Sequence, residues 1–267
     1  MKGKVLRVVL IVLASIVMIF SLVQIVKHYA DEKEAEDVYS DFLDYVKEPD
    51  KTEDFSKVET SDLSLKEVED ESTAIPDAEE NLLPVIDFDA LQANYPHVVG
   101  WIYLPDTPIN YPIVCGADNN QYLRHLPNGS YNDAGSIFLD YRCGKVGKTR
   151  NTVIYGHNMN NGTMFSTLTE YKYQGYFDDN PYIYLLTPEG NYRIEFYAGA
   201  VVDISSNIYS ALPDDDTFKE VLEEVKNKST FASDVRVGLS DNIVTLSTCS
   251  YEFENARFVM VGKLILI

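Results

Sequence analysis

The segment TLSTCSYEFENARFV, residues 245–259, ends a run of β-branched residues with a cysteine and places an arginine eight positions later. Side chains alternate across a strand, so Ser247 and Cys249 share one face, which is more polar than the face that carries Leu246. If the two halves of the segment pair as an antiparallel hairpin, Cys249 lies directly opposite Arg257, with Cβ atoms roughly 5 Å apart. The sequence therefore predicts a thiol and a guanidinium that face each other at the end of a sheet.

Eight short runs of residues, counting both halves of this segment, have the composition of β-strands. They are rich in Val, Ile, Tyr and Phe, and Gly, Pro, Asn or Asp residues separate them. The runs cover residues 97–104, 109–114, 136–141, 151–156, 182–187, 192–202, 242–249 and 257–267. Short strands at regular spacing are typical of a β-barrel or a β-sandwich. We therefore expect a mainly β fold.

One helix is predicted between the last two pairs of strands, in the stretch TFKEVLEEVKNKS, residues 217–229. Its apolar residues recur at helical spacing and share a face: Phe218, Val221, Leu222 and Val225. Thr217 and Glu220 have the spacing of a capping box, which predicts that the helix is capped at Thr217. The acidic residues 214–216 lie at its N-terminal end, where negative charge is favourable.

The stretch VVLIVLASIVMIFSLVQIV, residues 8–26, contains no charged residue and is long enough for a membrane-spanning helix. Three basic residues precede it, so we expect the N-terminus to stay in the cytoplasm and the chain after about residue 28 to lie outside. A cleaved signal peptide is the alternative, but no convincing A-x-A site follows. The expected location is a single-pass attachment to the cell membrane with an extracellular domain.

The chain is expected to have three parts, residues 1–28, 29–84 and 85–267. The first is a cytoplasmic tip and transmembrane anchor. The second begins with an amphipathic helix that Pro49 ends, and continues as an acidic spacer without a sustained period. The apolar residues of that helix are Ala35, Val38, Tyr39, Phe42 and Val46. The third part is the folded domain, and the first two are expected to contribute nothing to its chemistry, although the apolar face of the helix must cover something.

Charge and composition exclude two classes of partner. The formal net charge is −20, and the sequence has no cluster of Lys and Arg of the kind that nucleic-acid phosphates require. The folded part also lacks a dense carboxylate loop with the spacing of a calcium site. We therefore expect no nucleic acid, no metal and no cofactor.

The three cysteines, Cys115, Cys143 and Cys249, are odd in number, so at least one thiol is free or pairs between chains. A free thiol in an extracellular domain suggests a chemical role for that cysteine. His157 follows a predicted strand, where a loop can present its ring to a cleft. A lone histidine in a loop is more often structural, but the combination with Cys249 and Arg257 favours a nucleophile, a proton carrier and a cation.

These residues carry a resemblance to a known family. The segments at 151–165 (NTVIYGHNMNNGTMF) and 244–264 (VTLSTCSYEFENARFVMVGKL) resemble the sortases, the membrane-anchored cysteine transpeptidases of Gram-positive bacteria, and specifically class B. Residues 98–114 and 118–142 are similar to class B as well, and the resemblance covers residues 86–267. It implies a sortase-type eight-stranded β-barrel with an N-terminal helical region and a helix between the last strands.

The resemblance also implies a mechanism and partners. Cys249 would attack a threonine carbonyl in an NPQTN-like or NPxTG-like sorting signal and form a thioacyl enzyme. His157 would transfer the protons, and Arg257 would bind the signal and stabilise the oxyanion. The substrates would be surface proteins that carry the signal, and the acceptor would be an amine of the peptidoglycan cross-bridge or of a pilin.

The residues that the resemblance implies for the peptide groove are Asn119, Leu123, Ile208, Tyr209 and Ser247. One position departs from the family, because some class B enzymes have an acidic residue two positions after the cysteine and this chain has Tyr251. Glu252 and Glu254 are only sequence neighbours. The residue that orients His157 is therefore left open.

Two alternatives remain at the level of sequence. A papain-like or NlpC-like cysteine hydrolase of the cell surface would place its cysteine at a helix N-terminus, ahead of the histidine, whereas Cys249 ends a strand and follows His157. A non-catalytic surface binding module could use the same barrel, with Cys249 incidental and Arg257 a charge at the rim. Labelling with a thiol reagent separates an enzyme from a binding module, because a binding module would keep its function after Cys249 is modified.

Overall fold

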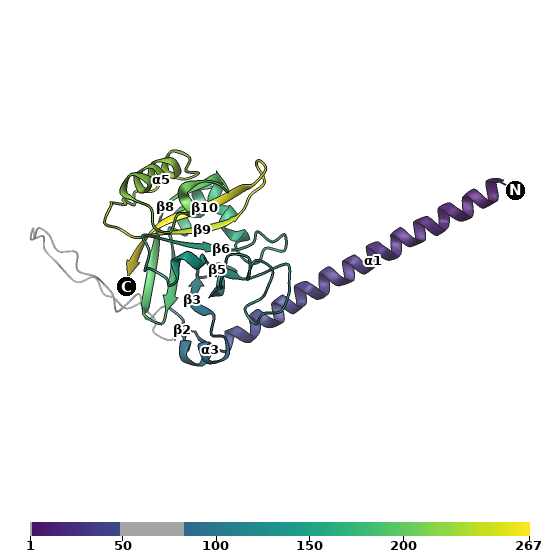
Figure 1. The fold of residues 1–267 in the computed structure, drawn as a ribbon, viewed down its shortest axis with the longest axis horizontal. Coiled ribbons are helices and arrows are strands. Elements are labelled where there is room, and N and C mark those ends of the chain that lie inside the picture. Colours follow the sequence, from purple (N-terminus) through teal and green to yellow (C-terminus); the bar gives the residue numbers. More distant parts are fainter. Residues whose placement is uncertain (1, 49–82) are drawn as a thin grey trace, which may run out of the picture.

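The computed structural model describes residues 2–48 and 83–267. Most of the acidic spacer expected within residues 29–84 lies outside the described residues. The described chain consists of one long N-terminal helix, a β-barrel and short helices around the barrel (Figure 1).

Each of the eight predicted runs corresponds to one strand of a closed barrel, with ends that differ by at most two residues where the strand extends beyond the run. The strands are β3 (Val98–Tyr103), β4 (Asn110–Cys115), β5 (Ile137–Leu139), β6 (Asn151–Tyr155), β7 (Tyr182–Thr187), β8 (Gly190–Asp203), β9 (Ile243–Cys249) and β10 (Ala256–Leu266). Their order around the barrel is β10-β8-β7-β3-β4-β5-β6-β9, and the pairing of β9 with β10 closes it. The prediction of an eight-stranded barrel is confirmed. The pairs β4–β5 and β6–β9 are parallel, and the others are antiparallel.

The barrel has a packed apolar core. Its largest cluster includes fully buried residues from most strands, among them Ile102, Ile154, Leu185, Phe196 and Met260. The polar face of β9 is buried as well, but its hydroxyl groups find partners within the protein. This strand therefore has packing on both faces, which holds its C-terminal end in place.

The helix α5 (Asp215–Asn227) lies outside the barrel against β8 and carries the four predicted apolar residues on its buried face. The predicted capping box is wrong, because Asp214 is the cap and its side chain accepts a hydrogen bond of 2.8 Å from the Thr217 backbone N–H. Asp214 has the extended backbone that an N-cap needs, and the acidic residues after it suit the first turn. The helix therefore begins two residues before Thr217.

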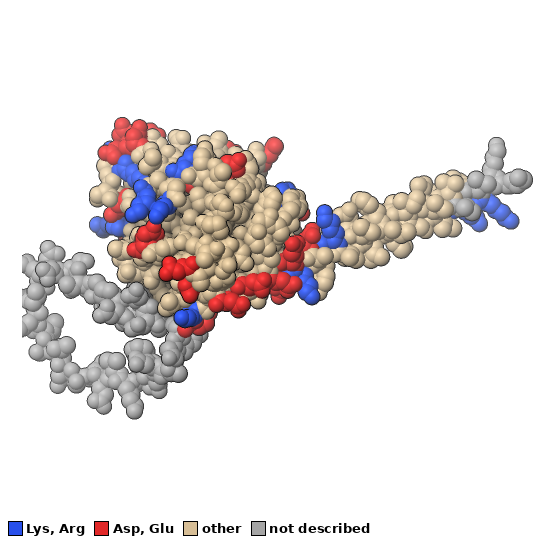
Figure 2. Space-filling model, turned by 60° about the horizontal axis from the view of Figure 1, so that its bottom comes forward, with Lys and Arg blue, Asp and Glu red and all other residues tan. Residues whose placement is uncertain are grey.

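The N-terminal helix α1 (Lys2–Leu43) joins the predicted membrane span and the predicted amphipathic helix without a break. It ends six residues before Pro49. The part from Val9 onward is long and apolar enough to cross a membrane. Figure 2 shows its apolar stretch between basic residues at both ends, with acidic side chains gathered where it meets the barrel.

The C-terminal part of α1 packs against the barrel, which answers what its apolar face covers. Phe42 is fully buried in a cluster with Leu91 and Trp101, and its ring lies 4.4 Å from that of Tyr95. The boundary expected at residue 85 thus separates segments that share one core.

Two short strands follow this contact and bring the ends of residues 48–84 together. They are β1 (Val46–Lys47) and β2 (Val85–Ile86), and they pair in antiparallel orientation. The pairing therefore places the residues that follow α1 beside the residues that lead into the barrel. The remaining helices are α3 (Phe88–Asn94), α4 (Gln174–Asp179), η2 (Tyr141–Cys143), η3 (Ser166–Lys172) and η4 (Asn207–Tyr209).

Candidate active site

Strand register brings Cys249, His157 and Arg257 to one end of the barrel. In the antiparallel pair β9–β10, Arg257 is the direct partner of Cys249, as the hairpin predicts. In the parallel pair β6–β9, Tyr155 is the partner of Ser247. His157 and Cys249 each follow two residues later, so they leave neighbouring strands at the same level.

All three side chains are half-buried and line one cleft with a volume of about 420 Å³. Four of the residues predicted for the peptide groove line the same cleft, namely Asn119, Leu123, Tyr209 and Ser247. Sequence reasoning missed the other lining residues, which are Phe138, Arg142, Tyr155, Gly156, Ile204 and Thr248. Candidate reactive groups and candidate groove residues therefore form one continuous surface.

Ile208 is the exception, and its predicted place in the groove is wrong. It is fully buried in a second apolar cluster with Phe218 and Val225 of α5. Its neighbour Tyr209 is half-buried at the cleft, because successive residues of the short η4 helix point in different directions. Ile208 anchors the turn that presents Tyr209.

Tyr209 and Ser247 are joined across the cleft floor. The Tyr209 hydroxyl and Ser247 Oγ lie 3.1 Å apart. Burial raises the pKa of Tyr209 to about 12, although the bond to Ser247 works in the opposite direction. The phenol therefore stays protonated at neutral pH and can act as a hydrogen-bond donor.

A backbone carbonyl holds the His157 ring. Nε2 of His157 lies 2.7 Å from the Leu123 carbonyl oxygen. A carbonyl can only accept, so Nε2 carries the proton and Nδ1 of the neutral ring is left with its lone pair. This contact answers the question of what orients His157, and residue-type reasoning missed it because the partner is a main-chain atom.

Glu252, one of the two glutamates that are sequence neighbours of Cys249, is engaged with Lys172 and Ser250. Lys172 donates to Glu252 at 2.6 Å and to Ser250 Oγ at 2.9 Å, and Ser250 also donates to Glu252. Partial burial raises the pKa of Glu252, but these hydrogen bonds and the Lys172 charge outweigh it and lower the pKa to about 2. Tyr251, at the position where some relatives have an acid, is 76% exposed.

A side chain ties the histidine loop to the cysteine strand. Asn158 Nδ2 donates to the Cys249 carbonyl oxygen at 3.0 Å. The bond connects the residue after His157 with the last residue of β9. It limits the relative movement of the two loops that carry the thiol and the imidazole.

All three cysteines are free, but only Cys249 lies in the cleft. Burial raises the pKa of the thiols of Cys115 and Cys143, which disfavours their thiolate forms. Arg257, opposite Cys249, has no carboxylate partner within 4.0 Å among the described residues, and its Nη1 donates to the Ala256 carbonyl. Its positive charge is thus available to a thiolate or an oxyanion.

No group of three or more His, Cys, Asp or Glu residues within 2–48 and 83–267 is arranged to hold a metal ion. The cleft brings together the thiol of Cys249, the imidazole of His157 and the guanidinium of Arg257. Together they can form and break an acyl bond to sulfur, because they supply a nucleophile, a proton carrier and a stabilising cation.

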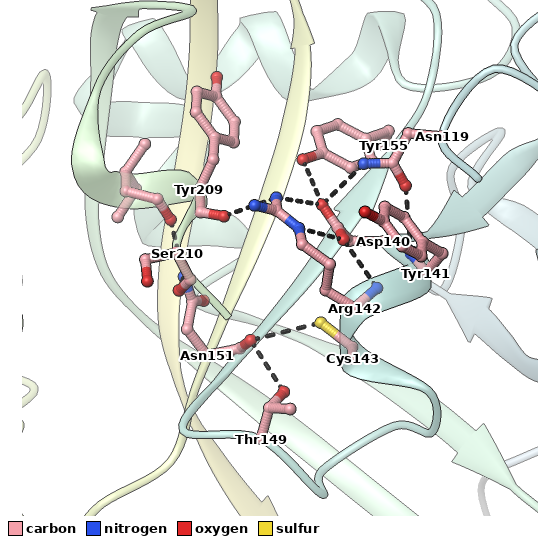
Figure 3. Close-up of polar contacts among 11 residues, drawn as sticks. Asn119, Asp140, Tyr141, Arg142, Cys143, Thr149, Asn151, Tyr155, Tyr209 and Ser210 are labelled. Carbon is pink, nitrogen blue, oxygen red and sulfur yellow. Dashed lines mark hydrogen bonds and ion pairs between the residues drawn. The ribbon is translucent and has the colours of Figure 1, made fainter. Parts of the chain in front are cut away.

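A buried acid organises another wall of the cleft (Figure 3). The Asp140 side chain is fully buried and accepts hydrogen bonds from Asn119, Arg142 and Tyr155, three residues that line the cleft. Burial raises the pKa of this carboxyl, but these donors outweigh the effect and hold the pKa below its ordinary value. Arg142 also donates to the Tyr209 carbonyl at 2.9 Å.

Comparisons with known proteins agree with this geometry. The sortase domain family matches residues 102–265, more than half of the chain. Sortase B of Listeria monocytogenes serovar 1/2a is 38% identical over 173 residues, which are 63% of this chain and 70% of that protein. Sortase B of Staphylococcus aureus is 33% identical over 181 residues, which are 67% of this chain and 74% of that protein.

Solved structures show the same similarity. The Staphylococcus aureus sortase B-substrate complex matches with a TM-score of 0.64 at 32% identity, over 67% of this chain and 85% of that one. Clostridium perfringens sortase B matches with a TM-score of 0.63 at 33% identity, over 67% of this chain and all of that one. This barrel is not the fold of the papain-like alternative. The chain belongs to the sortase family, within which it is a class B sortase, a cysteine transpeptidase.

Proposed function

We propose that Cys249 is the nucleophile of this transpeptidase and attacks the carbonyl carbon of a threonine in a sorting signal. The peptide bond after the threonine breaks, the sulfur takes the acyl group as a thioester, and the downstream fragment leaves as an amine. The observation that supports this assignment most is the strand register that aligns Cys249 with Arg257 and brings both to the level of His157.

His157 moves the protons in both halves of the reaction. Its Nε2 proton is engaged by Leu123, so Nδ1 is the atom that takes the thiol proton and returns it to the leaving amine. In the second half, the same nitrogen takes a proton from the incoming amine, which then attacks the thioester. The ring needs no carboxylate, because the Leu123 carbonyl sets its orientation.

Arg257 stabilises the negative charge that develops on the carbonyl oxygen. A guanidinium with no carboxylate partner keeps its charge for the transition state, and its planar fork can also hold the peptide backbone. Its place directly opposite Cys249 puts the positive charge near the reacting carbon.

The donor is a surface protein with an NPQTN-like or NPxTG-like signal, and the acceptor is an amine of the peptidoglycan cross-bridge or of a pilin. Sortases act on signal-bearing substrates and amine acceptors. The class B resemblance supports this kind of signal. A solved complex of sortase B with Gly3, which this chain matches with a TM-score of 0.63, supports a short glycine peptide as the acceptor to try first.

The helix α1 anchors the enzyme in the cell membrane with the barrel outside. Sortases are cell-surface proteins, and the helix has an exposed apolar stretch after a basic N-terminal flank. A signal sequence would have the same features but would be cleaved. Detection of the intact N-terminus in the membrane fraction of the source cells tests this part of the proposal, and a shorter mature chain in the medium would contradict it.

The enzymatic proposal is tested with a panel of fluorogenic pentapeptides, with and without triglycine. We expect cleavage of at least one NPQTN-type or NPxTG-type peptide after threonine and, when triglycine is present, a new product that joins threonine to glycine. Cleavage with water alone, unaffected by amines, would instead indicate a hydrolase. A failure to cleave any peptide of the panel would contradict the proposed signal.

A further inference from the structure

A second arginine, Arg142, lines the cleft and has N–H groups beyond those that bind Asp140 and Tyr209. The Arg142 side chain is 45% exposed, and its Nε and Nη2 donate to the two Asp140 oxygens at 2.8 and 2.6 Å. Nη2 also donates to the Tyr209 carbonyl. Nη1 carries two further N–H groups and forms none of these three bonds, and the Tyr155 hydroxyl is the other side-chain group that interacts with the guanidinium. Asp140 therefore fixes the edge of the guanidinium that carries Nε and Nη2, and Nη1 is at the other edge.

A contacting carboxylate compensates the charge of Arg142, whereas Arg257 interacts with the Asp203 carboxylate only over a longer distance. Asp140 is buried beneath it, and both carboxylate oxygens contact the guanidinium. Arg257 has no such partner within 4.0 Å among the described residues. The two arginines of one cleft therefore suit different ligands, an anion at Arg257 and a neutral acceptor at Arg142.

The neighbouring amide is oriented by the same acid. Asn119 Nδ2 donates to Asp140 at 2.9 Å, and its Oδ1 accepts from the Tyr141 backbone N–H at 3.1 Å. These partners determine the positions of Nδ2 and Oδ1 in the amide, because a carboxylate only accepts hydrogen bonds and a backbone N–H only donates them. The second N–H of Nδ2 remains, so this corner of the cleft presents N–H donors above a buried negative charge.

We propose that Arg142, positioned by Asp140, binds a side-chain carboxamide of the sorting signal and disfavours the corresponding carboxylate. The carboxamide oxygen accepts from Nη1, while a carboxylate would add a negative charge close to Asp140, whose own charge already balances that of Arg142. Arg142 is a binding residue that sets specificity, and Asp140 acts through it. This inference rests on the proposed function, because it concerns the donor peptide of the same cleft.

The test compares peptides that differ only by amide and acid, NPQTN against DPQTN and NPETN. The wild-type enzyme is expected to prefer the amide at one of the two positions by at least tenfold in kcat/KM. Arg142→Gln is expected to raise KM for NPQTN about tenfold, with kcat nearly unchanged, and to cleave the acidic peptide no better than wild type does, because Asp140 keeps its charge. Asp140→Asn leaves the guanidinium charge uncompensated and is expected to shift the ratio toward the acidic peptide.

Two controls make the outcome specific. Arg236→Gln makes the same substitution at an exposed arginine outside the cleft and is expected to keep the wild-type KM for NPQTN. The rate at which iodoacetamide alkylates Cys249 is expected to stay the same in Arg142→Gln, since Arg142 does not act on the thiol. A general structural defect would change this rate, so the rate separates a binding role from misfolding.

The comparison of amide and acid peptides uses only the wild-type enzyme. It therefore tests the amide preference even if Asp140→Asn does not fold. Cleavage without any amide preference would overturn the role of Arg142 and leave the proposed function standing. An unchanged KM for NPQTN in Arg142→Gln would overturn it as well. Absence of cleavage for every peptide would overturn both.

Discussion

Arg257 is the direct cross-strand partner of Cys249, at the point where β9 ends and β10 begins. The pair spans a short loop, and both side chains reach the same cleft. The thiol and a guanidinium that contacts no carboxylate lie on adjacent strands, and the burial of both strands along most of their length limits the relative movement of the two groups. This arrangement supports the view that the charge of Arg257 acts on the reacting carbonyl.

The substitution Arg257→Lys separates shape from charge. Lysine keeps the positive charge but loses the planar fork, so the rate of peptide cleavage is expected to fall by two to three orders of magnitude, about 2.7 to 4 kcal/mol. The measurement is kcat/KM with a fluorogenic signal peptide, beside a thermal melt as a folding control. Activity near that of the wild type would show that a simple positive charge is enough.

The three cysteines are expected to differ sharply when replaced by alanine. Cys249→Ala abolishes cleavage and keeps the fold, because no other thiol lies in the cleft. Cys115→Ala and Cys143→Ala are expected to retain cleavage rates close to wild type, since neither thiol contacts the reacting groups. Turnover that survives in Cys249→Ala would remove the nucleophile assignment.

The Glu252–Lys172 pair predicts a pH dependence of stability. The folded pKa of Glu252 lies near 2 and its ordinary value is 4.5, so the unfolded chain binds more protons between these values. The pair therefore stabilises the folded state above about pH 4.5, and this contribution is lost as the pH falls toward 2. The free energy of unfolding of Glu252→Gln is expected to lie below that of wild type at pH 6 and to approach it near pH 2.

The control for this series is Glu220→Gln, which alters an exposed glutamate on α5 that forms no ion pair among the described residues. Its difference from wild type is expected to be small at pH 6. If Glu252→Gln differs from wild type by the same amount at both pH values, the hydrogen bonds from Lys172 and Ser250 do not shift this carboxyl in solution.

Packing of Phe42 predicts that part of the N-terminal region stabilises the barrel. Phe42→Ala removes a fully buried ring and is expected to lower the free energy of unfolding by about 3 to 5 kcal/mol. Chemical denaturation of a chain that starts at residue 30, with and without the substitution, measures this. Val12→Ala, in the exposed part of α1, is the matched control in the full-length chain.

A chain that starts at residue 83 lacks this helix altogether. Sequence patterning alone leads to the expectation that it behaves like the longer one, whereas the contacts of Phe42 with Tyr95 and Trp101 lead us to expect a lower melting temperature. Equal melting temperatures for the two chains would support the predicted boundary at residue 85.

The barrel and the cysteine–arginine pair were predictable because both depend on local patterns. Strand periodicity marks each run, and the hairpin between β9 and β10 joins residues that are close in sequence, so counting residues was enough to pair Cys249 with Arg257. The position of His157 followed from a strand end in the same way.

The rest of the cleft depends on long-range contacts that spacing does not reveal. Asp140 gathers Asn119 and Tyr155 from different elements, and only the closed barrel brings them together. The partner of His157 is a main-chain oxygen, which residue identity cannot indicate. Ile208 was misplaced for a related reason, since a single turn of η4 decides which of two adjacent apolar residues faces the cleft.

The central claim is that Cys249 carries the peptide as a thioester, and intact-protein mass spectrometry tests it most directly. When the enzyme is mixed with an NPQTN-type peptide and quenched in acid, we predict a mass increase equal to the acyl fragment up to threonine. Digestion is expected to place it on Cys249, and prior addition of triglycine is expected to remove it. Cleavage without any adduct, or an adduct on Cys115 or Cys143, would contradict the account.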